Sequence, residues 1–191
     1  MIIKKDQIIL RDLQIKDIDD YERWYRTDTE WMNWDAPWEC KDGIKIDEMM
    51  TNIKRRINQG TNKPRSRLEV CLESGKHIGW VTSYFINGDP KKVAVGIDIP
   101  EVCYRSQGNG RIALECWIDY LFAERGLLRQ YTQTWSGNLQ MMNLAKRLGF
   151  QEIERRIGIR EVRGDKYDAI TYEITKERFF YGYSDEVDSS I

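Results

Sequence analysis

Alternating and helically spaced hydrophobic residues divide the first half of the chain into strands and helices. Asp17 is placed to act as the N-cap of a first helix reaching Arg26. Apolar residues within 46–57 recur every three to four positions, which predicts an amphipathic helix ending near Gly60, before a loop over 61–66. Turn-forming residues at 74–75 and 87–90 separate β-rich runs. We expect strands over 8–10, 67–73, 76–86 and 93–99, the last three antiparallel in succession.

The second half of the chain continues with helices and strands in alternation. Residues 112–122 are apolar almost all round, which indicates a helix buried against a sheet and closed by Gly126. A strand over 128–135 is followed by a helix over 138–148 with Gly149 as its cap. The last elements form a hairpin of strands over 150–162 and 167–174.

This element order predicts an α/β fold with one domain. We expect a mixed central sheet of about seven strands, antiparallel at first, with a strand–loop–helix–strand crossover in the middle and helices on both faces. The domain should occupy residues 1–180. Residues 181–191 form a polar, acidic tail that we expect to be mobile.

Composition and charge exclude several classes of protein. Thirty Lys and Arg residues stand against 31 Asp and Glu, so the net charge of −1 offers nucleic acid or an anionic membrane little attraction. No apolar run approaches the length of a membrane helix, and the N-terminus has no signal-peptide pattern, so we expect a cytoplasmic protein.

The cysteines and the single histidine give little support to metal or hydrolase chemistry. The cysteines are widely spaced and contain no C-x-x-C pair, which disfavours disulfides, zinc and a cysteine protease: Cys40, Cys71, Cys103 and Cys116. A Ser-His-Asp hydrolase would depend on His77, and a histidine at the edge of a strand is the commoner interpretation.

A glycine-containing loop between the strand over 93–99 and the buried helix is the first candidate site. It reads Arg105-Ser106-Gln107-Gly108-Asn109-Gly110-Arg111. Such a loop directs backbone N–H groups and a helix N-terminus toward one point, and glycine lets a pyrophosphate approach closely. A tight turn without ligand is the alternative. The spacing matches neither a P-loop nor a dinucleotide-binding fingerprint.

Three motifs in register resemble the GNAT superfamily of N-acetyltransferases. Arg105, Gly108 and Gly110 match the Q/R-x-x-G-x-G/A signature of that family. The stretch 134–150, with Asn138 after a strand and Gly149-Phe150 after a helix, is similar to its second motif. The stretch 167–172 resembles the last strand of the branch that acetylates ribosomal-protein N-termini. The likeness runs from about residue 8 to residue 179.

The resemblance implies acetyl-CoA as cofactor, with coenzyme A as product. The backbone around residues 97–99, from Ile97 to Ile99, would hold the pantetheine arm by strand-like hydrogen bonds. The loop amides would bind the pyrophosphate: Ser106, Gln107, Gly108, Asn109, Gly110 and Arg111, beside Arg105. Asn138 would contact the pantetheine or the acetyl end, although an N-cap of its own helix is an equal alternative.

The usual catalytic residues of the family cannot be transferred to this sequence. Leu144 lies in the stretch where many relatives have a tyrosine acid, Met141 replaces a serine, and Ala94 lies near a position that often carries a glutamate. Glu161 remains as a candidate base, with Asp98 as the competing carboxylate. A surface ion pair of Glu161 with its arginine neighbours, or transfer with solvent as the final base, are alternatives.

The acceptor should be a primary amine, either a small molecule or a peptide. Tryptophans and acids alternate in the segment after the first helix: Trp31, Trp34, Trp38, Asp28, Glu30 and Asp35. Aromatic faces beside carboxylates favour a cationic group, although tryptophans more often only pack the core. Of these, Trp31, Trp34, Asp35 and Glu30 are the expected substrate-binding residues.

Two further alternatives concern turnover and assembly. A module that binds acyl-CoA for regulation or sensing, without turnover, would explain the missing catalytic residues. Aromatic residues near the C-terminus could form a homodimer contact or cover their own sheet: Phe179, Phe180, Tyr181 and Tyr183.

Overall fold

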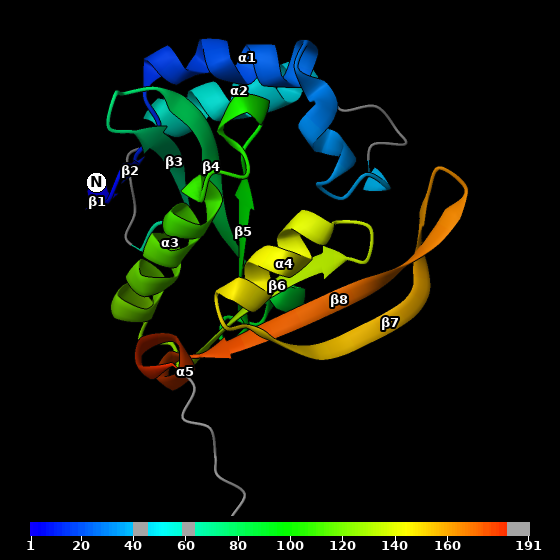
Figure 1. Ribbon diagram of the computed structural model, residues 1–191. Coiled ribbons are helices and arrows are strands. Elements are labelled where there is room, and N and C mark those ends of the chain that lie inside the picture. Colours follow the sequence, from blue (N-terminus) through cyan, green and yellow to red (C-terminus); the bar gives the residue numbers. More distant parts are fainter. Residues whose placement is uncertain (40–45, 59–63, 183–191) are drawn as a thin grey trace, which may run out of the picture.

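A computed structural model describes residues 1–39, 46–58 and 64–182 of the chain (Figure 1). Its strands are β1 (Ile2–Lys5), β2 (Ile8–Arg11), β3 (Arg67–Leu72), β4 (His77–Phe85), β5 (Val93–Asp98), β6 (Arg129–Trp135), β7 (Gln151–Val162) and β8 (Asp165–Thr175). Its α-helices are α1 (Ile18–Arg26), α2 (Ile46–Asn58), α3 (Asn109–Arg125), α4 (Leu139–Arg147) and α5 (Lys176–Tyr181). Short 3-10 helices include η2 (Thr29–Asn33) and η5 (Val102–Tyr104).

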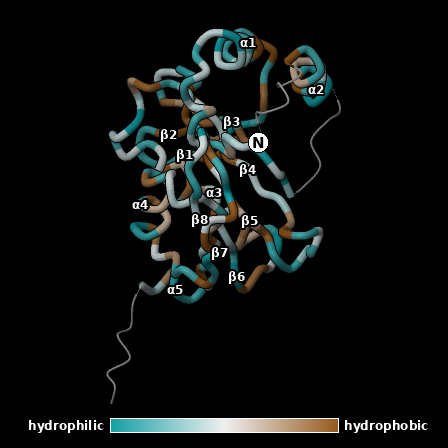
Figure 2. Tube along the Cα trace, turned by 90° about the vertical axis from the view of Figure 1, so that its right-hand side faces the viewer, coloured by the Kyte–Doolittle hydropathy of each residue, from teal (hydrophilic) through white to brown (hydrophobic). Residues whose placement is uncertain are grey.

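The strands form one mixed sheet in the order β1-β2-β3-β4-β5-β6-β8-β7. Every neighbouring pair is antiparallel except β5 and β6, which are parallel and joined through α3. In both Figure 1 and Figure 2, α1 and α2 lie at one end of the molecule and α5 at the other. The expected α/β architecture with a central crossover is therefore confirmed.

The buried residues of the paired strands β3 and β4 show that different helices cover the two faces of the sheet. Leu68 and Val70 belong to the core cluster that includes the buried side chains of α3. Trp80 of β4 instead belongs to the second cluster, with the aromatic side chains of α1 and the apolar side of α2. Since successive strand residues point to opposite faces, the two clusters lie on opposite sides of the sheet. The helices therefore cover both faces, as expected.

The central strands β5 and β6 separate soon after they meet. Their register contains one residue pair, Ala94 with Tyr131. One step further, the Thr132 hydroxyl donates to the Val95 carbonyl at 2.9 Å. Beyond that bond β4 still pairs with β5, through Val81 and Ile97 among others, but β6 pairs only with β8. The edge of β5 that faces β6 is therefore left open at its C-terminal end.

The structure differs from the sequence-based expectation at several points. The sheet has eight strands, because β1 folds back onto β2 through a turn in which Asp6 has a positive φ of 48°. The helix α5 was not expected. Asp17 lies at the N-cap position of α1 but makes no capping bond; its carboxylate accepts from Arg11 and from the Gln14 amide instead. The buried Arg11 guanidinium outcompetes the helix amides for this carboxylate.

The C-terminal aromatic residues partly cover their own domain. The rings of Phe179 and Phe180 lie 5.7 Å and 6.0 Å from Phe122 of α3. Tyr181 is exposed, and a homodimer contact there stays a prediction. The expected end of α2 near Gly60, residues 61–63 of the expected loop, Cys40, and residues 183–191 of the expected tail lie outside the described residues. Among the described residues no helix is long and apolar enough to cross a membrane.

The end of β5 is held in place by a close approach of β4. A Cβ added to Gly79 would lie 2.0 Å from the backbone oxygen of Asp98, a distance that would force the strands apart. By contrast, a Cβ on Gly96 would meet only the hydroxyl of Thr82, at 3.2 Å.

We therefore expect Gly79→Ala to lower the free energy of unfolding by about 1 to 3 kcal/mol, the usual cost of overpacking. Gly96→Ala, on the neighbouring strand, is the matched control and should cost less, because a side-chain oxygen can move and a paired backbone cannot. Urea denaturation of the three proteins measures the difference, and equal midpoints for both variants would contradict this account of the β4–β5 contact.

Candidate functional site

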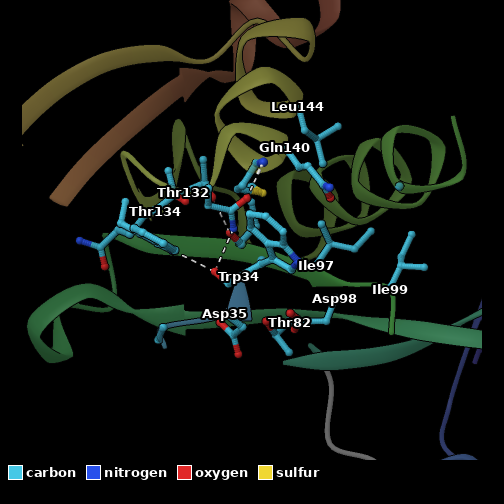
Figure 3. A pocket seen from close by; sticks show the side chains of 18 of the residues that line it. Trp34, Asp35, Thr82, Ile97, Asp98, Ile99, Thr132, Thr134, Gln140 and Leu144 are labelled. Atoms are coloured by element: carbon cyan, nitrogen blue, oxygen red, sulfur yellow. Dashed lines mark hydrogen bonds between the residues drawn. The ribbon is translucent and has the colours of Figure 1, made fainter. Parts of the chain in front are cut away.

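The gap between β5 and β6 opens into a cleft of about 960 Å³. Its lining comes from β3 and β4, the ends of β5 and β6, the start of α3, helix α4, the end of α1 with the following segment that contains η2, and the β7–β8 hairpin. Figure 3 shows Ile97, Asp98 and Ile99 on one wall and Gln140 and Leu144 of α4 on another. Segments far apart in the sequence therefore meet at the open edge of β5.

The cofactor end of the cleft combines an open strand edge with a helix N-terminus. Ile97 and Ile99 line it, and the strand edge beyond Val95 faces it. Gly108 adopts φ +84°, a left-handed conformation that glycine accepts without strain, and α3 begins at the next residue. The amides of the first turn of a helix have no intrahelical partner, so they are free to bind an anion.

The side chain of Arg105 braces the loop instead of projecting freely toward a phosphate. Its Nε donates to the Ile99 carbonyl at 2.6 Å and its Nη2 to the Pro100 carbonyl at 3.0 Å. Nη1 pairs with Glu30, whose other oxygen accepts from the Trp34 indole at 2.8 Å. Arg105 thus ties the end of β5 to the segment that contains η2, and Glu30 is engaged in this contact.

Asn138 uses both ends of its amide within the protein. Its oxygen accepts from the Met141 amide at 2.9 Å, which makes it the N-cap of α4 as one alternative anticipated. Its nitrogen donates to the Trp34 carbonyl at 3.0 Å, and the same carbonyl accepts from the Trp135 indole at 2.9 Å. The dashed lines in Figure 3 converge on this oxygen. The backbone of Trp34 is therefore fixed across the cleft against β6 and α4.

Two carboxylates face the middle of the cleft, Asp98 at the end of β5 and Asp35 just beyond η2 (Figure 3). Burial and the nearby charge of Asp35 raise the pKa of Asp98 to about 8, against the opposing effect of Arg67 and of a hydrogen bond from the Trp80 indole. The protein atoms around Asp35 and, to a smaller extent, the charge of Glu39 also raise the pKa of Asp35, although its side chain is exposed to the open cleft. Like charges near each other disfavour joint ionisation, so the pair holds a proton more readily than an isolated carboxylate.

A buried arginine supplies the opposing charge in the same wall. The Arg67 guanidinium lies 4.4 Å from the centre of the Trp80 ring and donates to the Tyr21 hydroxyl. Tyr21 in turn donates to Glu69, a carboxylate with no exposed surface. This chain of contacts fixes Arg67 on the cleft side of a charged network that lies beneath α1 and α2.

The single histidine belongs to that network and not to the cleft. His77 is buried at the start of β4, with its ring nitrogens 3.2 Å from Asp20 and 3.2 Å from Glu69. Burial opposes the charged imidazole, but these carboxylates outweigh it and raise the pKa of His77. It is not one of the residues that line the cleft, so a hydrolase built on His77 has no geometric support.

Most of the site residues expected from the sequence meet at this cleft. The lining includes Ile97, Asp98, Ile99, Arg105, Ser106, Gly108, Gly110, Arg111, Asn138, Trp31, Trp34 and Asp35. Four expected residues are not part of the lining: Gln107, Asn109, Glu30 and Glu161. The Gln107 side chain donates to the Cys103 carbonyl, and that of Asn109 is buried, donating to the Tyr104 carbonyl.

Glu161 and Trp31 differ most from their expected roles. Glu161 is exposed on β7 opposite Lys166, outside the cleft, so its role as base stays a prediction without support from the geometry. Trp31 reaches the cleft but is 6% exposed, with its ring 5.2 Å from Trp80 and 5.1 Å from Tyr25. Its packing contacts match the alternative in which the tryptophans build the core.

Several lining residues on β4 were not expected from the sequence. Trp80, Thr82 and Tyr84 alternate along the strand and all line the cleft. Because these residues are two positions apart, their side chains point to the same face of β4, and this alternation could have been recognised from the sequence. Arg67 of the neighbouring strand gave no comparable signal, because a single arginine in a strand does not reveal which groups surround it.

Comparison with protein-family models gives a match to the acetyltransferase (GNAT) domain over residues 7–151. The chain belongs to the GNAT acetyltransferase family. This GNAT match ends at the start of β7, so the β7–β8 hairpin lies outside it. A search of curated proteins gives no significant match to the sequence.

Solved structures of GNAT proteins resemble this chain over nearly its whole length. An acetyltransferase from Bacillus anthracis superimposes with a TM-score of 0.73 at 15% identity, covering 93% of this chain and 99% of the other. A spermidine N-acetyltransferase from Vibrio cholerae, in complex with CoA and spermine, gives 0.73 at 19% identity, covering 92% and 99%. RimL, a ribosomal L7/L12 α-N-protein acetyltransferase in complex with coenzyme A, gives 0.70 at 17%, covering 92% and 98%.

These matches confirm the expected family, the acetyltransferase class and the fold. The presence of CoA in two of the structures agrees with the acetyl-CoA cofactor expected from the sequence. The residues of this GNAT chain also fit that cofactor, because the open edge of β5 and the start of α3 line one continuous cleft.

The start of α3 provides a direct test of cofactor binding. A Cβ on Gly110 would lie 3.5 Å from Ile99, an ordinary contact that the fold tolerates, but the branches of a larger side chain would extend into the cleft. We expect Gly110→Val to weaken acetyl-CoA binding by about tenfold or more, through lost hydrogen bonds to the loop amides. Calorimetric titration measures the affinity, and an unchanged melting temperature shows that the variant is folded. Equal affinity in a folded variant would remove this loop from the cofactor site.

Proposed function

We propose that this GNAT protein transfers the acetyl group of acetyl-CoA directly to a primary amine, with Asp98 as the group that accepts the amine proton. The observation that carries the proposal is the position of Asp98. It follows immediately on the open strand edge at Ile97, beside the expected pantetheine path, and it faces the same cleft as Asp35.

The chain provides a separate contact for each part of acetyl-CoA. Backbone groups at Ile97 and Ile99 would hold the pantetheine arm, and the amides from Ser106 to Arg111 would hold the pyrophosphate, with the exposed Arg111 adding positive charge. When bound, acetyl-CoA supplies an activated acyl group. By fixing it beside the amine, the protein replaces a bimolecular encounter with an oriented one.

The carboxylate pair suits an acceptor that arrives as an ammonium ion. A cation between Asp35 and Asp98 would relieve their mutual repulsion and lower both pKa values, so that Asp98 becomes ionised beside the amine. Ionised Asp98 would then take the proton that the amine must lose before it attacks. Of the acidic residues expected to attract the amine, Asp35 is the one we assign to the acceptor, whereas Glu30 forms an ion pair with Arg105.

The identity of the amine is left open by the relatives. The similar spermidine N-acetyltransferase is in complex with spermine, and the similar RimL is a ribosomal-protein α-N-acetyltransferase. The fold therefore accepts both small and peptide amines. The same cleft also supports the alternative of a module that binds acyl-CoA without turnover, since Leu144 lies where many family members have a tyrosine acid and lines the cleft.

Release of free thiol from acetyl-CoA with a panel of amines tests the proposed activity. Asp98→Asn should lower kcat by about 100-fold or more, as expected for loss of a general base, with little change in acetyl-CoA affinity. Glu161→Gln is the matched control, since Glu161 lies outside the cleft, and should leave kcat near that of the native protein. A loss in Glu161→Gln with an unaffected Asp98→Asn would reverse the assignment. Binding of acetyl-CoA without thiol release for any amine would favour the module.

The pH dependence provides an independent test of the carboxylate pair. Because Asp98 must be ionised to act as a base, kcat/KM should rise with pH through a midpoint near 8, the raised pKa of Asp98 in the free enzyme. Asp35→Asn removes the adjacent negative charge, so the pKa of Asp98 and the midpoint should both fall. Using one amine for both proteins cancels its own ionisation. A midpoint that stays fixed would show that the two carboxylates do not interact, and a midpoint that rises would contradict the expected effect of the Asp35 charge on Asp98.

A further inference from the structure

The β7–β8 hairpin closes one end of the cleft against the segment that contains η2. Figure 1 shows its tip beside that segment, and Arg163 at the tip donates to Asn33 of η2. Further in, the Arg160 guanidinium lies 4.2 Å from the centre of the Trp38 ring. Trp38 packs edge-on against Trp135 of β6, at 6.0 Å. Both Arg160 and Trp38 line the cleft.

Two hydrogen-bond donors remain unused at this place. The Nε of Arg160 and the Nε1 of Trp38 are buried and have no hydrogen-bond partner among the described residues. Neither group can accept a hydrogen bond, so only an acceptor atom can satisfy them. Leaving a buried donor unpaired is costly, so two neighbouring unpaired donors that line the same cleft indicate a place for an acceptor group.

Among the described residues of β7, none forms an ion pair with the positively charged side chain of Arg160. The ion pairs found on β7 are made by Arg155, with Glu152 and Asp168, and by Arg156, with Glu154. No ion pair that involves Arg160 is found in the part of the chain that the structure describes. A guanidinium stacked on an aromatic face keeps its edge available, and a planar carboxylate or a phosphate fits that edge.

We propose that the acceptor carries an acidic group in addition to its amine, and that Arg160 Nε and Trp38 Nε1 bind this group while the amine faces Asp98 and Asp35. The inference rests on the proposed function and names the acceptor class: an amine that also bears a carboxylate or a phosphate. Opposite charges at two places in one cleft orient such a molecule in a single direction. A polyamine without an acidic group would leave both donors unsatisfied.

The location of these donors separates acceptor choice from cofactor binding. Arg160 belongs to the hairpin, which follows the stretch matched by the family model, whereas the loop and α3 lie within that stretch. Substitutions at Arg160 should therefore change which amine binds without changing the affinity for acetyl-CoA, and we expect the same for Trp38, which lies within the matched stretch but packs against Arg160 and is not part of the loop over 105–111.

Binding of matched amine pairs to the protein saturated with CoA tests the proposal without requiring turnover. Phenylalanine is compared with phenylalaninamide for the carboxylate, and O-phosphoethanolamine with ethanolamine for the phosphate, by calorimetry. At least one acidic member should bind about tenfold or more tightly than its partner without the acidic group, as a charged hydrogen bond provides. Which pair shows the preference identifies the acidic group.

The variants assign that preference to the two donors. Arg160→Gln should reduce it to less than about threefold, and Trp38→Phe, which keeps the ring face but removes the N–H, should reduce it in part. Lys166→Gln is the control, because Lys166 is an exposed cation of the same hairpin that does not line the cleft. CoA affinity, measured in each variant, should be unchanged.

Three results would overturn the proposal: members without the acidic group that bind as tightly as those with it, a preference that survives Arg160→Gln, or no binding by any of the four probes. Failure of the proposed function is recognised separately. In that case the acidic probes would bind with the expected preference, and no amine would release free thiol from acetyl-CoA.

Discussion

The separation of β5 from β6 is the constraint on which the rest of this structure depends. Two parallel strands normally share a continuous ladder, but here one residue pair and one side-chain bond, from Thr132 to Val95, mark the end of contact. A buried strand edge needs partners for its backbone groups. The open edge of β5 therefore predisposes this place to bind an extended molecule with amide groups of its own, as pantetheine has.

Several contacts keep that gap at a fixed width. On one side, β4 holds β5 so closely at Gly79 that no side chain fits between them. Across the gap, the carbonyl of Trp34 accepts bonds from Trp135 and Asn138, and Arg105 ties the end of β5 to Glu30. These bonds give Asn138, Arg105 and Glu30 a structural role in the protein, whether or not they also contact a ligand. Contacts of this kind hold the walls of the cleft in place, as a site needs when its reacting groups must meet within a fraction of an ångström.

Charge is distributed along the cleft in a definite order. Arg111 and the loop amides lie at the cofactor end, and the Asp98–Asp35 pair lies in the middle, with Arg67 in the wall beside it. Arg160 and Trp38 lie at the hairpin end. The protein around the cleft lowers the local dielectric constant and so strengthens the effect of each charge on nearby groups, while the molecule as a whole is nearly neutral. A nearly neutral chain can thus present positive and negative charge at separate places in one cleft.

The sequence by itself determined most of the elements, the crossover and the cofactor loop, but not β1 or α5. Hydrophobic periodicity reports which face of an element is buried, and the motif around Gly108 and Gly110 is local in the chain, so both can be read from neighbouring residues. The tertiary structure alone decided which carboxylate faces the cleft. Asp98 and Glu161 look alike in sequence, but one follows an open strand edge and the other lies on an exposed hairpin strand. The pKa of Asp98 and the unpaired donors of Arg160 and Trp38 likewise depend on neighbours more than 20 residues away, and such contacts exist only once the chain is folded.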